Sequence, residues 1–241
     1  KRTSGEEAQS LFKEMRTGQG AHRMRKLPLT PLTNLAEQNA RDEVSFVVDG
    51  VWQTNWRGAE DLDLLRSKGI THVLSTLDPD ENPHPQHFKY LNLVFEDEDD
   101  AVLDQYIMKG VSHIREGAKQ GGCVVHCAAG VSRSSSFVLC FLMTEYRWTL
   151  LESFHALRER RPVSWPNPSF MAQLISFEKS LFGGLTSLRQ SDYDSWADEN
   201  KDAIVMAKAV DRDWSSRSLL GKTASSASLG KAGSSASLSN A

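Results

Sequence analysis

A cysteine and an arginine separated by five residues offer the clearest chemistry in this 241-residue chain. Cys127 follows the apolar pair Val124-Val125, which is typical of a buried strand, and Arg133 opens a helical pattern after Gly130. A loop that ends at a helix N-terminus turns several backbone N–H groups into one concavity, which favours an anion. Arg133 adds a planar fork of donors that fits two oxygens of a phosphate. The same field favours the thiolate of Cys127, so the segment predicts a nucleophile on the floor of a phosphate site.

A longer motif surrounds this pair. The fixed set His126, Cys127, Gly130, Arg133 and Ser134 would arise by chance in a chain of this length with odds on the order of one in 10,000. On these residues the sequence resembles the cysteine-dependent protein phosphatases, and more closely the small dual-specificity phosphatases, whose loop reads HCxxGxxRS. The resemblance covers about residues 44 to 182. It implies hydrolysis of phosphate monoesters on tyrosine, serine and threonine side chains of proteins.

The resemblance implies a role for each residue of the loop. Cys127 would attack phosphorus and form a phosphocysteine, while Arg133 would stabilise the oxygens of the transition state. Ser134 would donate a hydrogen bond to the sulfur as it leaves, and His126 would orient the loop. The remaining loop positions would bind the phosphoryl oxygens; they are Ala128, Ala129, Gly130, Val131 and Ser132. This chemistry needs no metal and no cofactor.

A general acid must protonate the leaving oxygen and then activate water. The resemblance places this aspartate on a loop about 30 residues before the cysteine, after a strand, which here is Asp97. Four other acidic residues surround it, Glu96, Glu98, Asp99 and Asp100, and such a run is by default a solvated loop. We expect Asp97 to be the acid because of its distance from the strand predicted before it.

Other substrates fit the motif less well. The larger tyrosine-only phosphatases carry a Trp-Pro-Asp loop upstream of the cysteine, whereas Trp165-Pro166-Asn167 lies downstream and is predicted to begin a helix. Phosphoinositide phosphatases usually have Lys or Arg inside the loop, and this loop has none. RNA triphosphatase relatives are disfavoured by a net charge of -3. A rival from another class is a catalytically silent module that only binds phosphoproteins, but such proteins usually lose the nucleophile.

The elements that must position these residues alternate between strands and helices. Strands are predicted over 44–48 and 51–53, which pair as a hairpin, and over 70–74, 88–95 and 123–126. Helices are predicted over about 55–65, 102–114, 133–146, 149–160 and 168–182. This order predicts an α/β fold in which a central, mostly parallel sheet is flanked by helices on both faces, as in cysteine phosphatases. The catalytic domain would span residues 44–183.

Composition limits the kinds of partner and the cellular compartment that we expect for this protein. Near-balanced charge disfavours nucleic acid as a partner, and no apolar stretch is long enough to span a membrane. The chain has three cysteines and no CxxC motif, so they do not form a disulfide framework. This points to a reducing compartment, cytoplasmic and/or nuclear. Cys123 lies on a predicted buried strand and Cys140 on an apolar helix face, so both are expected to be core thiols, with an internal disulfide to Cys127 as the alternative.

The two ends of the chain look unlike the domain. Residues 1–43 are predicted to form an extended arm, in which Arg23 to Leu29 resembles the docking motif of mitogen-activated protein kinase partners; a plain flexible arm is the alternative. Residues 184–241 are predicted to be a low-complexity, largely disordered tail, apart from one amphipathic helix that would use Trp196, Ile204, Val205, Ala207 and Val210.

One further arginine could contact substrate. Arg158, Arg160 and Arg161 could form an exposed basic face, or Arg161 could line the rim of the pocket and accept a second phosphate on the substrate.

Overall fold

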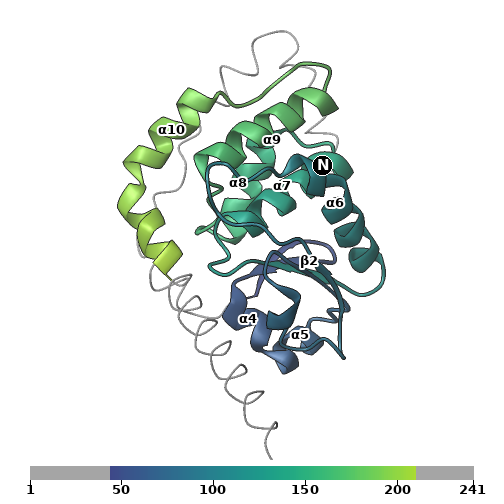
Figure 1. Cartoon of the computed structure of the whole chain (residues 1–241). Coiled ribbons are helices and arrows are strands. Elements are labelled where there is room, and N and C mark those ends of the chain that lie inside the picture. Colours follow the sequence, from purple (N-terminus) through teal and green to yellow (C-terminus); the bar gives the residue numbers. More distant parts are fainter. Residues whose placement is uncertain (1–43, 210–241) are drawn as a thin grey trace, which may run out of the picture.

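The computed structural model describes residues 44–209, coloured along the sequence in Figure 1. The strands are β1 Ser45–Val48, β2 Val51–Thr54, β3 His72–Ser75, β4 Lys89–Asn92 and β5 Cys123–His126. The α-helices are α4 Trp56–Glu60, α5 Leu62–Ser67, α6 Asp104–Lys119, α7 Arg133–Glu145, α8 Leu150–Arg160, α9 Pro168–Leu181 and α10 Gln190–Glu199. Residues 201–209 are also helical. The arm at 1–43, with Arg23 to Leu29, and the chain from 210 onward lie outside the described residues.

The strands form one sheet in the order β1-β2-β5-β3-β4. Only β1 runs antiparallel, paired with β2, so the predicted mostly parallel sheet is confirmed. His126, the last residue of β5, lies opposite Thr54 of β2 and Ser75 of β3. The carboxyl ends of three parallel strands therefore meet at one edge of the sheet, and Cys127 is the first residue beyond that edge.

Helices cover both faces of the sheet, as the sequence predicts. Figure 1 shows α4 and α5 on one side and the helices α6 to α9 on the other. In β5, Val124 packs with Leu65 in the small cluster under α5, whereas Cys123 and Val125 belong to the large cluster under α6 and α7. A strand that is buried on both faces reads as an unbroken apolar run, which is why it is visible in the sequence. Among the described residues, no helix has both the length and the apolar character that crossing a membrane requires.

The helix predicted over 55–65 is two helices. Asn55 accepts a hydrogen bond from the Gly58 amide at the start of α4, and Asp61 accepts one from the Leu64 amide at the start of α5. Asp61 has a non-helical backbone with φ -84° and ψ 88°. An aspartate that caps the second helix therefore interrupts the pattern, because its side chain competes for the backbone amides.

The prediction of a largely disordered tail from 184 is wrong as far as residue 209. Glu178 of α9 is 1% exposed, and its carboxylate accepts hydrogen bonds from the backbone amide and hydroxyl of Ser187 at 2.8 and 2.7 Å. Leu188 and Tyr193 are buried in the large cluster, and α10 packs on α9. A Ser- and Asp-rich composition suggested a solvated tail, but a few apolar and hydroxyl residues suffice to anchor it. The single amphipathic helix predicted here is two helices, because α10 ends at Glu199 and a second helix covers residues 201–209. Ala207 is buried as predicted, but Val205 is 47% exposed, and Val210 lies outside the described residues.

Candidate active site

The Cys127 side chain lies at the bottom of the loop between β5 and α7 and is 2% exposed. The Gly130 N–H donates to its sulfur at 3.1 Å. The Ser134 hydroxyl lies 3.3 Å from the same sulfur, with either atom able to donate. Both contacts would stabilise a thiolate, because a charged acceptor strengthens the hydrogen bonds it receives.

The loop needs glycine at position 130. Gly130 has φ +67°, a left-handed conformation that side chains rarely adopt. A Cβ atom there would lie 2.6 Å from the Thr54 carbonyl oxygen and 2.8 Å from the Asn55 nitrogen. Both are backbone atoms that cannot move aside, so any other residue would distort the loop.

The surrounding elements hold the carbonyl groups of the loop. Trp56 N–H donates to the Ala128 carbonyl at 3.0 Å, and Trp165 N–H donates to the Val131 carbonyl at 2.7 Å. Every peptide bond in the described residues is trans, so each carbonyl points opposite to the next N–H. The amides that follow Ala128 and Val131 therefore point away from Trp56 and Trp165. This arrangement makes the loop a nest of donors for an anion.

Gln53 of β2 supports the same loop and was missed by sequence analysis. It is fully buried, and its side-chain nitrogen lies 3.2 Å from the Gly130 carbonyl oxygen, 3.1 Å from Ser134 Oγ and 2.9 Å from Ser135 Oγ. A glutamine at an inward position of a central strand needs such partners, because an unpaired amide costs free energy when buried. That polar residue within the strand was the signal in the sequence.

The prediction that Arg161 lines the rim of the pocket is wrong. Arg161 is 4% exposed, and its Nε donates to the Gly130 carbonyl at 2.9 Å while Nη1 donates to Ser45 Oγ at 3.3 Å. It therefore supports the loop from behind. The exposed basic face is also wrong for Arg158, which is 4% exposed with its guanidinium 4.6 Å from the centre of the Trp165 ring. Only Arg160 of the three is exposed.

We expect Arg161→Ala to lower the free energy of unfolding by about 1–3 kcal/mol, because buried hydrogen bonds to Gly130 and Ser45 are lost. Urea denaturation measures this change. Exposed Arg160→Ala is the matched control, expected to stay within about 0.5 kcal/mol of the original. Binding of singly and doubly phosphorylated peptides should weaken to the same degree. If Arg161→Ala weakened binding of the doubly phosphorylated peptide alone, Arg161 would contact the second phosphate at the rim of the pocket after all.

Arg133 connects the loop to the acidic segment. Its side chain is buried, and Nη1 donates to the Phe95 carbonyl at 3.0 Å and lies 3.8 Å from the Glu96 carboxylate. Arg133, the first residue of α7, is therefore held against the segment that leads to Asp97. A guanidinium held in place before substrate binds costs little reorganisation when charge develops.

Asp97 is distinct from the four acidic residues around it. Glu96, Glu98, Asp99 and Asp100 are exposed, whereas the Asp97 side chain is 14% exposed. The Ser132 hydroxyl donates to Asp97 Oδ1 at 2.5 Å, and the Asn167 side-chain amide donates to the same oxygen at 2.9 Å. Asp97 thus lies against the loop that holds Cys127. Asn167 also caps α9, as predicted, but its contact with Asp97 was not foreseen.

A lysine from the C-terminal helical segment completes the surroundings of Asp97. Lys208 Nζ lies 2.6 Å from Asp97 Oδ2. Burial alone would raise the pKa of Asp97, but Lys208, Ser132 and Arg133 together hold it below its usual value. The carboxylate is therefore ionised over most of the pH range.

His126 and the two buried thiols outside the loop are neutral at pH 7. Burial lowers the pKa of His126 to about 4, so this imidazole is uncharged at neutral pH. Burial raises the pKa of the Cys123 and Cys140 thiols, which keeps them protonated. All three cysteines are free, and the expected core thiols are buried. Within residues 44–209, no cluster of His, Cys, Asp and Glu could hold a metal ion.

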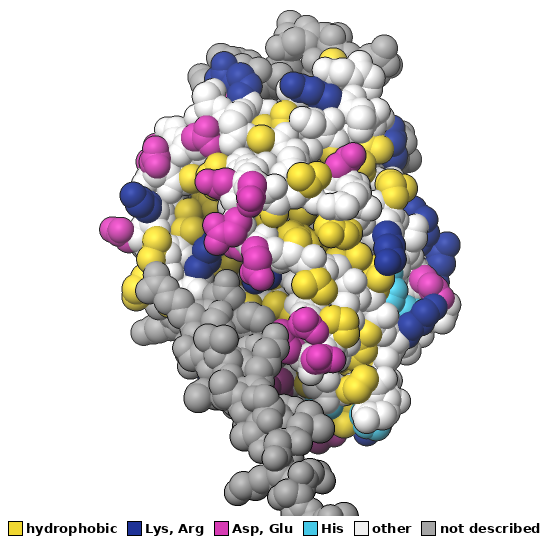
Figure 2. Space-filling view, in the orientation of Figure 1, with side chains coloured by type: hydrophobic (Ala, Val, Ile, Leu, Met, Phe, Trp, Pro, Cys, Tyr) yellow, Lys and Arg dark blue, Asp and Glu magenta, His cyan; other side chains and the backbone are white. Residues whose placement is uncertain are grey.

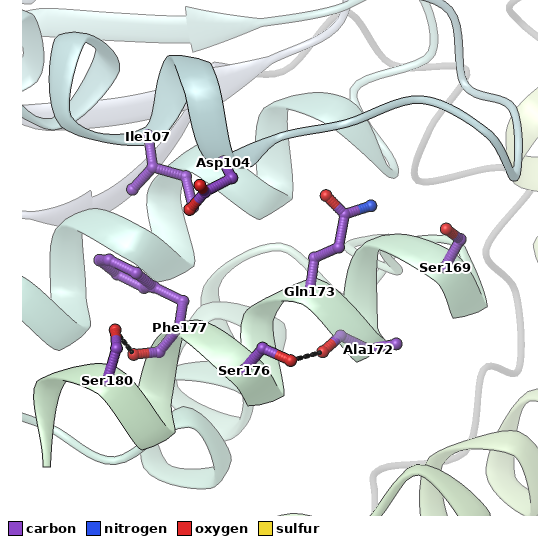
Figure 3. A pocket seen from close by; sticks show the side chains of 8 residues that line it. All are labelled: Asp104, Ile107, Ser169, Ala172, Gln173, Ser176, Phe177 and Ser180. Atoms are coloured by element: carbon purple, nitrogen blue, oxygen red, sulfur yellow. Dashed lines mark hydrogen bonds between the residues drawn. The ribbon is translucent and has the colours of Figure 1, made fainter. Parts of the chain in front are cut away.

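A separate groove of about 360 Å³ lies between α6 and α9 (Figure 3). Its lining includes Asp104, Gln173 and Phe177 and none of the residues around Cys127. Gln173 accepts from the Leu103 amide at 2.7 Å and donates to the Ala101 carbonyl at 2.9 Å. The groove wall therefore fixes the end of the segment that carries Asp97.

Figure 2 shows acidic side chains across the middle of the visible face and no continuous basic surface there.

Comparisons with known proteins support the assignment of the loop. The family model "Dual specificity phosphatase, catalytic domain" matches residues 51–180. Dual specificity protein phosphatase 1 of Arabidopsis thaliana is 33% identical over 138 residues, which cover 57% of this chain and 70% of that protein. MAP kinase phosphatase with leucine-rich repeats protein 3 of Dictyostelium discoideum is 34% identical over 141 residues, but the match spans only 16% of its length. The solved structure of human tyrosine phosphatase-like serine/threonine/tyrosine-interacting protein aligns with a TM-score of 0.54 and 26% identity, covering 58% of this chain and 98% of that one.

Proposed function

Because the chain belongs to the dual-specificity phosphatase family, we propose that it hydrolyses phosphotyrosine and phosphoserine or phosphothreonine in proteins through a phosphocysteine intermediate. The observation that carries this proposal is the buried Cys127 sulfur, which accepts from Gly130 N–H under a loop whose following amides point away from the scaffold. Asp97 lies against the same loop through Ser132. These contacts support the proposal that a nucleophile, an anion site and an acid act together at one edge of the sheet.

In the first step the Cys127 thiolate attacks phosphorus, and the bond from phosphorus to the leaving oxygen breaks. Asp97, in its protonated form, gives its proton to that oxygen. Arg133 and the loop amides stabilise the charge on the remaining phosphoryl oxygens. The products are the dephosphorylated side chain and a phosphocysteine.

In the second step water attacks the phosphocysteine, and Asp97 accepts a proton from it. The sulfur–phosphorus bond breaks and inorganic phosphate leaves. Ser134, 3.3 Å from the sulfur, donates a hydrogen bond to the departing thiolate. The enzyme returns to its starting state without a metal or a cofactor.

The test is hydrolysis of phosphotyrosine and phosphothreonine peptides in the presence of a chelator. Turnover of both peptides supports the proposal. Binding without turnover would support the rival function, a phosphoprotein-binding module.

We further propose that the substrates are mitogen-activated protein kinases. This rests on the name of the Dictyostelium relative and on the sequence Arg23 to Leu29. We also propose a cytoplasmic or nuclear location, which rests on the free thiols.

Asp97→Asn should lower kcat/KM for a phosphotyrosine peptide by about 10²- to 10⁴-fold, because the amide cannot donate or accept the required proton. The loss should be smaller for para-nitrophenyl phosphate, whose leaving group needs less protonation. In the original protein kcat/KM should decline at high pH, because Asp97 loses the proton that it must donate. This decline should disappear in the variant. Steady-state kinetics across pH measure all three effects.

The control is Glu98→Gln, which changes an exposed acid one residue away. It should leave the pH profile unchanged. If instead Glu98→Gln removed the decline at high pH and Asp97→Asn did not, the general acid would be reassigned within the acidic run.

A further inference from the structure

Lys208 and Asp97 are 111 positions apart in the sequence, yet they form a close ion pair. Lys208 Nζ lies 2.6 Å from Asp97 Oδ2, with 29% of the lysine side chain and 14% of the aspartate side chain exposed. The pair is therefore largely shielded from solvent, and its attraction is weakened less than at an open surface. Nothing in the proposed reaction requires a cation at this oxygen.

The segment that carries Lys208 is held firmly against the domain. Tyr193 of α10 is fully buried and its hydroxyl donates to the Pro166 carbonyl, one residue before Asn167. Ala207, next to Lys208, is 1% exposed. Figure 1 shows α10 and the following helix along the side of the domain, beside α8 and α9. The C-terminal helical segment, residues 190–209, thus contacts both Asp97 and the turn that carries its partner Asn167.

The charged groups around Asp97 act in one direction. Lys208 faces it from the C-terminal helical segment and Arg133 from α7, and both favour the ionised carboxylate. Burial raises the pKa of the Tyr193 phenol on α10, and the negative charge of Asp97 raises it further, so this neighbour is neutral. The neutral donors are Ser132 and Asn167, and the flanking acids Glu96 and Glu98 point into solvent. Lys208 supplies the largest single contribution that favours ionisation.

An ionised carboxylate cannot donate the proton that the first step needs. We propose that Lys208 is a positioning residue that holds Asp97 ionised at the edge of the loop, so that the C-terminal helical segment restrains the first step of the reaction. This inference rests on the proposed function. Withdrawal of residues 201–209, or loss of the Lys208 charge, removes this restraint. Asp97 then keeps only its contacts with Ser132 and Asn167 and the weaker attraction of Arg133.

The test compares Lys208→Met, Lys208→Arg and Lys201→Met by the pH dependence of kcat/KM for a phosphotyrosine peptide. Methionine keeps the length of the side chain and removes its charge, arginine keeps the charge, and Lys201 is an exposed lysine on the same segment. In Lys208→Met the decline at high pH should move to higher pH, with kcat/KM at pH 7.5 rising about three- to tenfold. Lys208→Arg and Lys201→Met should keep the original profile.

A second comparison separates this effect from a structural one. Combined with Asp97→Asn, Lys208→Met should no longer change kcat/KM, because the carboxylate on which it acts is absent. Titration of the Asp97 carboxyl by carbon NMR should show a higher pKa in Lys208→Met whatever the activity. An unchanged profile and titration, or an equal loss of activity at every pH in both backgrounds, would overturn the inference. No Cys127-dependent turnover in the original protein would instead overturn the proposed function.

Discussion

Cys127→Ser should lower kcat for a phosphotyrosine peptide by about four orders of magnitude or more. The serine hydroxyl has nearly the shape of the thiol and can keep the contacts with Gly130 N–H and Ser134. Its oxygen is almost never ionised at neutral pH, however, so the attack on phosphorus is lost. Single-turnover kinetics with a radiolabelled peptide measure the effect, and rapid acid quenching should trap label on the original protein only.

Cys140→Ser is the matched control for this prediction. Cys140 is a buried thiol on α7 and lies outside the loop. The control should retain turnover within about threefold and lose about 1–3 kcal/mol of stability, because a hydroxyl replaces a thiol in an apolar position. Cys127→Ser should still bind the phosphopeptide. Turnover by Cys127→Ser above about one percent of the original would contradict the phosphocysteine route.

The sequence alone could predict the parts of the site that lie close together along the chain. The span from His126 to Ser134 contains the strand end, the turn and the helix start, so its residue types specify the loop directly. The sheet was also predictable, because β5 is buried on both faces and reads as a continuous apolar run. Asp97 needed the resemblance, since composition cannot separate it from its four acidic neighbours.

The supports of the loop could not be predicted in this way. Gln53 reaches Gly130 from 77 positions upstream, and Arg161 reaches the same carbonyl from 31 positions downstream. Their positions follow from strand order and helix packing, which no local pattern contains. Arg161 also shows why charge is a poor guide to exposure: a guanidinium is buried readily when backbone carbonyls accept its hydrogen bonds.

The C-terminal helical segment shows a related limit. An amphipathic pattern in the sequence predicted a helix here. Such a pattern does not indicate which surface of the domain the apolar side packs against. The buried carboxylate of Glu178, with its bonds to Ser187, directs the chain back over α9. This return path places Lys208 on Asp97 and makes a segment outside residues 51–180, the range of the family match, part of the surroundings of the site.

Arg133→Ala should lower kcat by about 10³- to 10⁵-fold, because the guanidinium is the only charged group in the loop that can stabilise the phosphoryl oxygens as the leaving bond breaks. The change in KM should be smaller, since the backbone amides still bind the ground-state phosphate. Arg133 also donates to the Phe95 carbonyl, so the alanine variant loses a support of the acidic segment. Steady-state kinetics and urea denaturation together separate the two effects.

Arg133→Lys distinguishes geometry from charge. Lysine keeps the positive charge but cannot present two donors in one plane, so kcat should remain at least about 100-fold below the original. The exposed Arg160→Ala variant should retain full activity, which excludes a general effect of removing positive charge from this side of the protein. If Arg133→Lys kept more than about a tenth of the original kcat, charge alone would account for the role of this residue. A module that only binds phosphoproteins would show the opposite pattern, in which both variants weaken binding and no turnover exists to lose.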